Sequence, residues 1–447
     1  MREKKERSRK NWIAKLSGKN TEKTETETIA MVKKAVLVGC NYPGTKAELH
    51  GCINDVKRMQ RSLIERFGFA EEDIRVLIDT DPRSEQPTGI NVRRALSDLV
   101  EGSEEGDVLF FHYSGHGVQI PAESGEADDT GYDECIVPCD MNLITDDDFR
   151  EIVNELPRGC PLTIVSDSCH SGGLISHAKQ QVGVLASKQS SHESGSNSDG
   201  LKGLIIDGVH GALESRGIHL PFGHHQSQHE RPSDRREVHY SGGGHAKSRA
   251  LPLSTFLEMF EQKTGRHNVT VGNIRPSLFD AFGEDASPKV KKFVSLIVSR
   301  LQSGESESFW GTVGALAQDF LKTKLDEAHD SSQYVQPALD TPATSHQAAY
   351  AGSNPELRKK RSADMGILVS GCQSDETSAD ANPTGNPKEA YGALSNAVQT
   401  ILAQTDGPLT NRDLVLSVRK HLAQQGFKQH PCLFCSDENV ETIFICE

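Results

Sequence analysis

Short apolar runs alternate with amphipathic stretches along the first part of the chain, and this alternation limits the possible folds more than any other feature. The runs are rich in β-branched residues and predict strands at 35–39, 74–78, 108–113 and 162–165. Apolar residues recur at helical spacing between them, at 56–67 and 92–100. Strands separated by helices form parallel sheets with right-handed crossovers. The sequence therefore predicts an α/β protein with a central, mostly parallel sheet flanked by helices.

The rest of the chain divides by composition. Its 447 residues exceed the roughly 250–300 at which a single core stops growing, so we expect several parts. We expect a disordered extension (1–30), the alternating region (31–178) and a flexible linker (179–249). An inserted helical region (250–360) and a final region (361–447) follow. The final region is predicted to hold a strand at 367–370, helices at 390–402 and 413–422, and a strand at 442–445. Eight of the 18 histidines lie between His192 and His245, but their irregular spacing favours a linker over a metal site.

Charge and composition exclude several classes of protein. The 49 basic and 63 acidic residues give a net charge of −14, whereas a nucleic-acid-binding protein needs a basic face. No apolar run approaches the ~20 residues of a membrane-spanning helix. Ten cysteines are too few for a disulfide scaffold, so we expect free thiols and a reducing, cytoplasmic location. Most of these cysteines lie in or beside apolar runs, which predicts buried thiols.

Two segments place reactive side chains just beyond predicted strands. His112–Gly117 follows the apolar strand residues 108–111, and Ser166–Gly173 follows the strand at 162–165. Parallel strand ends open into one crevice, so Cys169 and His116 form a plausible nucleophile and base. The backbone N–H groups of Gly117 and Cys169 are then candidate oxyanion donors. A buried structural cysteine and a hydrogen-bonded core histidine are the alternative interpretation.

These segments also resemble a known family. Residues 113–117 (YSGHG) and 167–172 (DSCHSG) resemble the two signature motifs of caspase-like cysteine peptidases. Residues 41–49 and 133–140 resemble metacaspases, and the long insert with residues 274–280 and 372–380 resembles their type II branch from plants and green algae. The resemblance implies a caspase-like (caspase-hemoglobinase) fold and cysteine endopeptidase activity. It assigns Cys169 as nucleophile and His116, rather than the adjacent His170, as general acid and base.

Metacaspase resemblance implies cleavage after Arg or Lys, and a cationic side chain needs carboxylates around it. The candidates are Asp55, Asp167 and Asp380. A helix-terminal acid for Asp55 and structural roles for the other two are the alternatives. Within the same fold, the alternative specificity is for asparagine or aspartate, and a non-catalytic scaffold is the alternative outside enzymes.

An acidic stretch from Gly117 to Phe149 contains ten acids and no Lys or Arg. Such a cluster can stay solvated, or it can converge on calcium, which takes six to eight oxygen ligands. The resemblance implies calcium activation and favours the second interpretation. The candidate ligands are Glu126, Asp128, Asp129, Asp133, Asp146 and Asp147.

The resemblance further implies a zymogen that cleaves itself in the linker, where a basic residue blocks the acidic pocket until it is cut. Among the linker's basic residues, Arg236 is the predicted cleavage site. We expect protein or peptide substrates, a monomer, no nucleic-acid or membrane partner, and a role in stress or damage responses or programmed cell death.

Overall fold

The computed structural model describes residues 31–122, 132–175, 178–183, 245–302, 365–373 and 376–445. All the elements below lie in one compact unit, Lys33–Glu447. Within the described ranges, no helix is long and apolar enough to cross a membrane.

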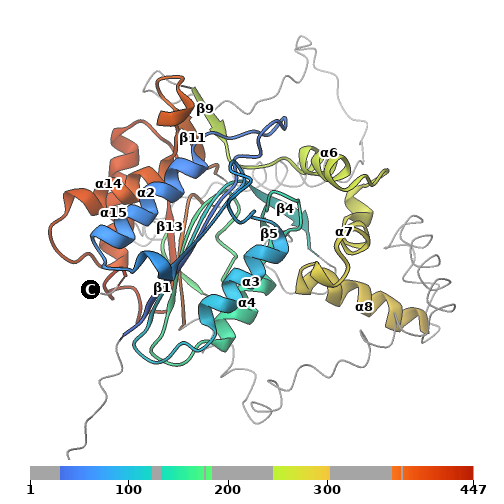
Figure 1. Cartoon of the computed structure of the whole chain (residues 1–447), viewed down its shortest axis with the longest axis horizontal. Helices are drawn as coiled ribbons and strands as arrows, with labels where there is room; N and C mark the ends of the chain where they lie inside the picture. Colours follow the sequence, from blue (N-terminus) through green and yellow to red (C-terminus); the bar gives the residue numbers. More distant parts are fainter. Residues whose placement is uncertain are drawn as a thin grey trace, which may run out of the picture. The chain divides into compact units, whose positions relative to one another are not determined.

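A seven-stranded sheet forms the centre of this unit (Figure 1). Its order is β2 (Ile74–Ile78), β1 (Lys33–Gly39), β3 (Val108–Ser114), β7 (Leu162–Asp167), β10 (Gly366–Ser370), β13 (Cys432–Cys435) and β8 (Lys179–Val182). The first five strands are parallel, and the last two pair antiparallel. Because β7 pairs with β10, the first and final regions of the chain build one sheet.

Helices cover both faces of this sheet (Figure 1). One face carries α2 (Cys52–Glu65), α14 (Ala393–Gln404) and α15 (Asn411–Gln424), and the other carries α3 (Gly89–Val100) and α4 (Asp146–Glu155). Successive side chains of a strand point to opposite faces. Accordingly, Ala35 and Leu37 of β1 join the core beneath α2, whereas Val36 and Val38 join the core beneath α3. Burial on both faces explains why the strands are continuous apolar runs.

Two smaller sheets and a helical insert surround the central sheet. One antiparallel sheet contains β4 (Gly117–Pro121), β5 (Tyr132–Ile136) and β6 (Ile144–Thr145). The other contains β12 (Tyr391–Gly392), β11 (Ala379–Asn382) and β9 (His245–Ser248). The insert contributes α6 (Leu253–Thr264), α7 (Ile274–Phe282) and α8 (Pro288–Gln302). Short 3-10 turns lie at Glu71–Asp73, Val271–Asn273, Gly283–Asp285 and Pro387–Glu389.

The predicted α/β class and the early strands and helices are confirmed, but later segments differ from the predictions in two places. Both described ends of the predicted linker are strands, β8 and β9, which pair with β13 and β11. The final strand lies at Cys432–Cys435, while the segment 442–445 makes only an isolated bridge between Ile443 and Thr410. The sequence of β8 (KQQV) lacks an apolar alternation, so its conformation depends on its tertiary pairing.

Candidate active site

The two reactive segments follow neighbouring strands at the same edge of the sheet. β3 and β7 pair in parallel, with Ser114 in register with Asp167. His116 and Cys169 each lie two residues beyond this pair, and both are buried. The sheet therefore brings the predicted nucleophile and base to matching positions beyond adjacent strands, at the same edge of the sheet.

Gly117 allows the two segments to approach closely. A Cβ atom placed on Gly117 would lie only 1.7 Å from the carbonyl oxygen of Cys169, so no other residue fits without moving the backbone. The N–H of Gly117 points instead at the linker, where it donates to the carbonyl of Arg249 at 3.0 Å. Gly117 thus combines a packing requirement with a hydrogen bond at the predicted oxyanion position.

The His116 ring is held on several sides. Its Nε2 lies 2.7 Å from the carbonyl oxygen of Ala47, which can only accept, so Nε2 carries a proton. Tyr42 packs against the ring with centroids 4.9 Å apart, and its hydroxyl accepts the His116 backbone N–H. Nδ1 lies 3.1 Å from the Arg249 carbonyl oxygen. Burial lowers the pKa of His116 to about 4, so the ring is neutral and carries one proton at neutral pH. With that proton on Nε2, where the contact is shorter, Nδ1 is the basic nitrogen and faces the Arg249 carbonyl.

Donors from the final region surround the Cys169 thiol. The backbone N–H of Ser378 donates to Cys169 Sγ at 2.9 Å. The Cys372 thiol also hydrogen-bonds to Cys169, which together with burial raises the pKa of Cys372. Cys372 therefore stays protonated and can act as a donor. Both contacts place a hydrogen-bond donor beside the Cys169 sulfur.

Three buried carboxylates form an acidic pocket beside the crevice. Asp55 lies in the first turn of α2, Asp167 at the end of β7, and Asp380 in β11. Their carboxylates surround the fully buried guanidinium of Arg249, at 3.0 Å from Asp55, 3.3 Å from Asp167 and 3.1 Å from Asp380. The structure thus brings all three predicted pocket acids together.

The acidic pocket contains more negative groups than positive ones. Burial raises the pKa of Asp55 to about 7, although Arg249 and the Ser114 hydroxyl oppose this shift. Burial also raises the pKa of Asp167, again opposed by Arg249. Asp55 therefore exchanges a proton near neutral pH, and the charge of the acidic pocket changes with it.

The segment around Arg249 is held as an extended strand. β9 pairs antiparallel with β11, and the N–H of Arg249 donates to the Ser378 carbonyl at 2.9 Å. Beyond Arg249, the N–H of Leu251 donates to the Gly117 carbonyl at 2.8 Å. The peptide bond between Arg249 and Ala250 thus lies among His116, Gly117 and the acidic pocket. This arrangement resembles a peptide held by its backbone on a sheet edge, with one side chain in a specificity pocket.

Comparison with known proteins identifies the family. Residues 33–177 match the model of the metacaspase peptidase C14 domain. The chain is 53% identical over 424 residues to metacaspase-4 of Arabidopsis thaliana. This match covers 93% of this chain and 100% of the relative. The chain belongs to the metacaspases. It is also 50% identical over 423 residues to metacaspase-6 of Arabidopsis thaliana, with the same coverage. Metacaspase-1 of Cryptococcus neoformans is 50% identical but matches only 31% of this chain. This metacaspase is therefore of type II, with a caspase-like fold and cysteine-type endopeptidase activity.

The candidate calcium ligands in this metacaspase are only partly described. Glu126, Asp128 and Asp129 lie outside the described residues, as does Arg236. Asp133 contacts Arg275 at 2.5 Å and Lys289 at 2.7 Å.

The remaining two candidates also pair with cations. Lys289 lies 3.2 Å from Asp146, and Asp147 pairs with Arg150 at 2.5 Å. Among the described residues, no group of three or more His, Cys, Asp or Glu side chains is arranged so that it could hold a metal ion. Two predicted ligands, Asp133 and Asp146, nevertheless share one cation.

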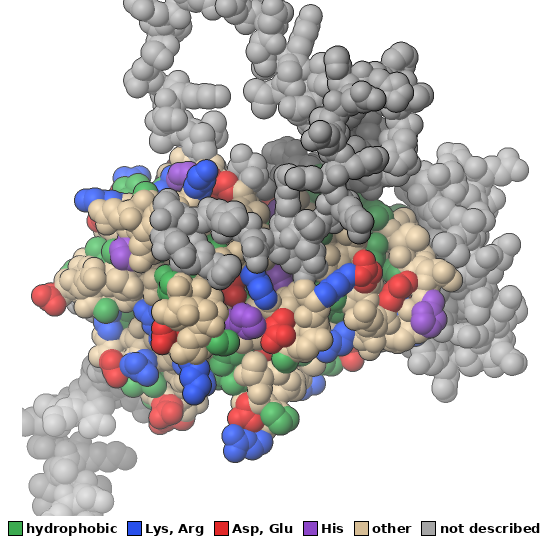
Figure 2. Space-filling view, turned by 90° about the horizontal axis from the view of Figure 1, so that it is seen from above, with side chains coloured by type: hydrophobic (Ala, Val, Ile, Leu, Met, Phe, Trp, Pro, Cys, Tyr) green, Lys and Arg blue, Asp and Glu red, His purple; other side chains and the backbone are tan. Residues whose placement is uncertain are grey.

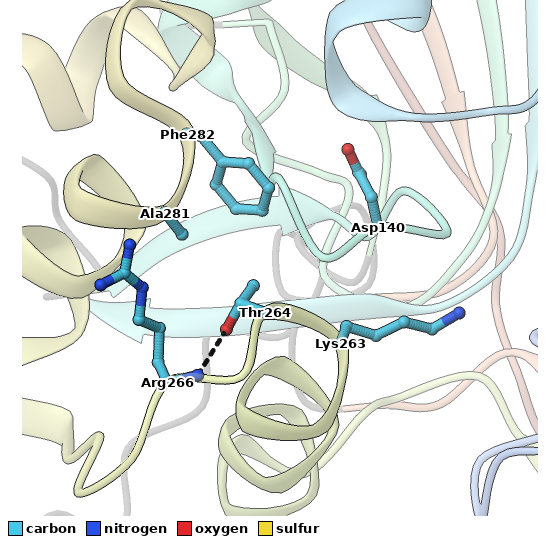
Figure 3. A pocket seen from close by; sticks show the side chains of 6 residues that line it. All are labelled: Asp140, Lys263, Thr264, Arg266, Ala281 and Phe282. Atoms are coloured by element: carbon cyan, nitrogen blue, oxygen red, sulfur yellow. Dashed lines mark hydrogen bonds between the residues drawn. The ribbon is translucent and has the colours of Figure 1, made fainter.

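A separate cavity of about 260 Å³ lies between α6 and α7 (Figure 3). It is lined by Asp140, Lys263, Thr264, Arg266, Ala281 and Phe282. None of these residues belongs to the acidic pocket or the crevice. On the described surface seen in Figure 2, acidic and basic side chains are interspersed rather than gathered by sign.

Sequence reasoning missed several groups around the crevice. Ala47 and Ser378 act through their backbones, which leave no signature in side-chain chemistry. Arg249 was one basic residue among several in the linker. No local pattern of the sequence distinguishes it from the others.

Proposed function

We propose that this metacaspase cleaves peptide bonds after arginine or lysine, with Cys169 as nucleophile and His116 as general acid and base. The observation that carries the proposal is the position of Arg249. Its guanidinium lies among three buried carboxylates while its carbonyl accepts a hydrogen bond from Gly117. A substrate arginine held in the same way would present its carbonyl to the crevice.

In the proposed mechanism, the Cys169 thiolate attacks the carbonyl carbon of the basic residue. The N–H groups of Gly117 and Cys169 stabilise the oxyanion. His116 Nδ1 accepts the thiol proton and returns it to the leaving amine, because Ala47 fixes the ring through Nε2. Water then hydrolyses the thioester. Cys169→Ala should abolish hydrolysis while leaving the acidic pocket intact.

The acidic pocket favours arginine over the alternative residues. The guanidinium of an arginine can donate several hydrogen bonds to the three carboxylates, whereas a lysine presents a single compact ammonium. An aspartate would bring a further negative charge to three carboxylates, and an asparagine would leave them without a cation. Peptides that differ only in Arg, Lys, Asn or Asp before the cut bond test this. We expect Arg to be cleaved fastest, then Lys; preferential cleavage after Asn or Asp would overturn the proposal.

We further propose that the chain is a zymogen and that self-cleavage separates Arg249 from Ala250. Arg249 fills the acidic pocket, so a substrate side chain cannot enter while the linker is uncut. Arg236, the site expected from the sequence, remains the alternative. N-terminal sequencing of the smaller fragment distinguishes the two, because it begins at Ala250 in one case and at Glu237 in the other.

Calcium is proposed as the activating ion. Asp133 and Asp146 direct carboxylate oxygens at one cation, and such oxygen donors suit calcium. In this conformation that cation is Lys289, so a metal must compete with Lys289 and Arg275 for the same oxygens. When bound, calcium would supply charge neutralisation to the acidic loop. Calorimetric titration of Cys169→Ala measures binding without self-cleavage, and absence of binding at millimolar calcium would contradict the proposal.

We also propose that the protein is a cytoplasmic monomer. It would act on protein substrates in stress responses or programmed cell death. This proposal is supported by the resemblance to metacaspases and by the free thiols of the described residues. The non-catalytic scaffold is disfavoured by the presence of both His116 and Cys169 in one crevice. Labelling of Cys169 by an electrophilic peptide ending in arginine tests this point, since a scaffold would not react at an enhanced rate.

A further inference from the structure

Cys372 lies beside the candidate nucleophile and has no place in the proposed hydrolysis steps. β7 and β10 are parallel neighbours, with Ser166 in register with Ser370. Cys169 follows the first of these residues by three positions, and Cys372 follows the second by two. Continued beyond the strands, this register sets Cys372 opposite Ser168, the residue before Cys169. Adjacent strands lie about 4.8 Å apart, so the two cysteines extend from neighbouring backbone segments.

The two loops pack tightly at this point. A Cβ atom on Gly371 would lie 3.1 Å from the carbonyl oxygen of Ser168, so glycine allows the backbones to approach. The Ser378 hydroxyl donates to the same carbonyl at 3.3 Å. Within this packing, both cysteine side chains are buried, and Cys169 lies close enough to raise the pKa of Cys372. The Cys372 thiol also donates to the Glu376 carbonyl at 3.4 Å.

We propose that Cys372 is a resolving thiol that forms a disulfide with Cys169 after peroxide oxidation. In the first step, the Cys169 thiolate attacks one oxygen of hydrogen peroxide; an S–O bond forms, the O–O bond breaks, and hydroxide leaves. In the second step, the Cys372 sulfur attacks the sulfenic sulfur; an S–S bond forms, the S–O bond breaks, and the Cys372 proton leaves with hydroxide as water. The two sulfurs lose two electrons in total, and the peroxide is reduced to water.

The surroundings of the two sulfurs favour this order of events. Hydrogen bonding to Cys169 and burial raise the pKa of Cys372, which keeps it a neutral and poorly reactive thiol until its neighbour is oxidised. Without a resolving thiol, a sulfenic acid proceeds to sulfinic acid, which is irreversible in most proteins. The disulfide instead stops activity in a form that a dithiol reductant reverses. The inference rests on the proposed role of Cys169 as the reactive thiol.

The proposed cleavage site gives this inference a direct readout. Cleavage after Arg249 leaves Cys169 and Cys372 on separate fragments, so their disulfide joins the fragments again. The calcium-treated wild type is exposed to about one equivalent of hydrogen peroxide, and free thiols are then blocked with N-ethylmaleimide. We expect a band of full-length mass on a non-reducing gel, which disappears with dithiothreitol. Peptide mapping should identify the Cys169–Cys372 link, and it does so even if the chain was never cut.

Two variants make the experiment decisive. Cys372→Ser should lose the cross-link and should recover at least about tenfold less of its own starting activity after dithiothreitol, because Cys169 is overoxidised. Cys432→Ser is the matched control, since Cys432 is a buried thiol on the strand next to Cys372 and should behave like the wild type.

Each alternative result bears on a different proposal. The inference is wrong if the wild type yields no Cys169–Cys372 peptide, if the link goes to Cys432, or if Cys372→Ser recovers fully. Wild-type mapping decides the question if Cys372→Ser does not fold. A chain that stays uncut on the reducing gel counts against self-cleavage alone.

Discussion

Two regions of this metacaspase pair carboxylates with a cation from a distant part of the chain. In the acidic pocket, Arg249 meets three acids, and every side chain involved is at most 1% exposed. At the edge of the insert, Lys289 meets Asp133 and Asp146, and the latter remains 18% exposed. A fully dehydrated cluster strongly discriminates the cation it accepts, whereas a partly hydrated one exchanges cations more easily. We therefore assign side-chain recognition to the first region and ion exchange to the second.

The largest expected difference between the two regions comes from removing one charge in each. Asp167→Asn leaves the substrate cation without one of its buried partners, and such losses cost about 3–5 kcal/mol. We expect kcat/KM for an arginine peptide to fall by at least about 100-fold. Asp146→Asn is the matched control and should change this value little at saturating calcium. Equal losses in both variants would break the comparison.

Substitution of the linker cation has the next largest effect. Arg249→Gln removes the side chain that the acidic pocket accepts, so the bond to Ala250 should no longer be cut. An arginine peptide added as substrate should still be hydrolysed, because the carboxylates of the acidic pocket are unchanged. A gel with N-terminal sequencing measures both the loss and any new site. If Arg249→Gln is processed at the wild-type rate to a fragment that begins at Glu237, Arg236 is the site of self-cleavage.

The acidic pocket should also respond to pH. The pKa of Asp55 is raised to about 7, so its proton is lost as the pH rises through neutrality. Loss of the proton adds negative charge and strengthens the binding of a cationic side chain. We expect kcat/KM for an arginine peptide to rise by about tenfold or less between roughly pH 6 and 8. Lys289→Gln should keep this profile, and a profile that falls over the same interval would contradict the assignment.

The smallest expected effect is on the calcium requirement. Lys289→Gln removes the ammonium that neutralises Asp133 and Asp146, so calcium no longer competes with it. The calcium concentration for half-maximal activity should fall by about threefold, a partly screened electrostatic effect. Lys291→Gln is the control, because Lys291 lies on the same helix and donates to the Glu284 carbonyl instead. An increased calcium requirement in Lys289→Gln would show that the ammonium supports the site.

Much of the fold followed from local patterns. Strands such as 74–78 and 108–113 are buried on both faces of the sheet. They therefore need apolar residues at successive positions, and this continuous run can be recognised in the sequence. The edge strands β8 and β9 were not predicted, because their few residues gain their conformation from β13 and β11. β13 was missed for a related reason: Cys432–Cys435 is short, and it is held as a strand by its pairing with β10 and β8.

The sequence by itself determined the family, the α/β class and the side chains that carry the proposed chemistry. His116, Cys169 and the pocket acids have reactive groups in motifs that can be recognised locally. Only the tertiary structure decided that Arg249, rather than another linker residue, fills the acidic pocket, and that Cys372 contacts Cys169. The physical reason is that both relations join segments far apart in sequence. Their geometry depends on the pairing of β7 with β10 and of β9 with β11, and no local pattern records it.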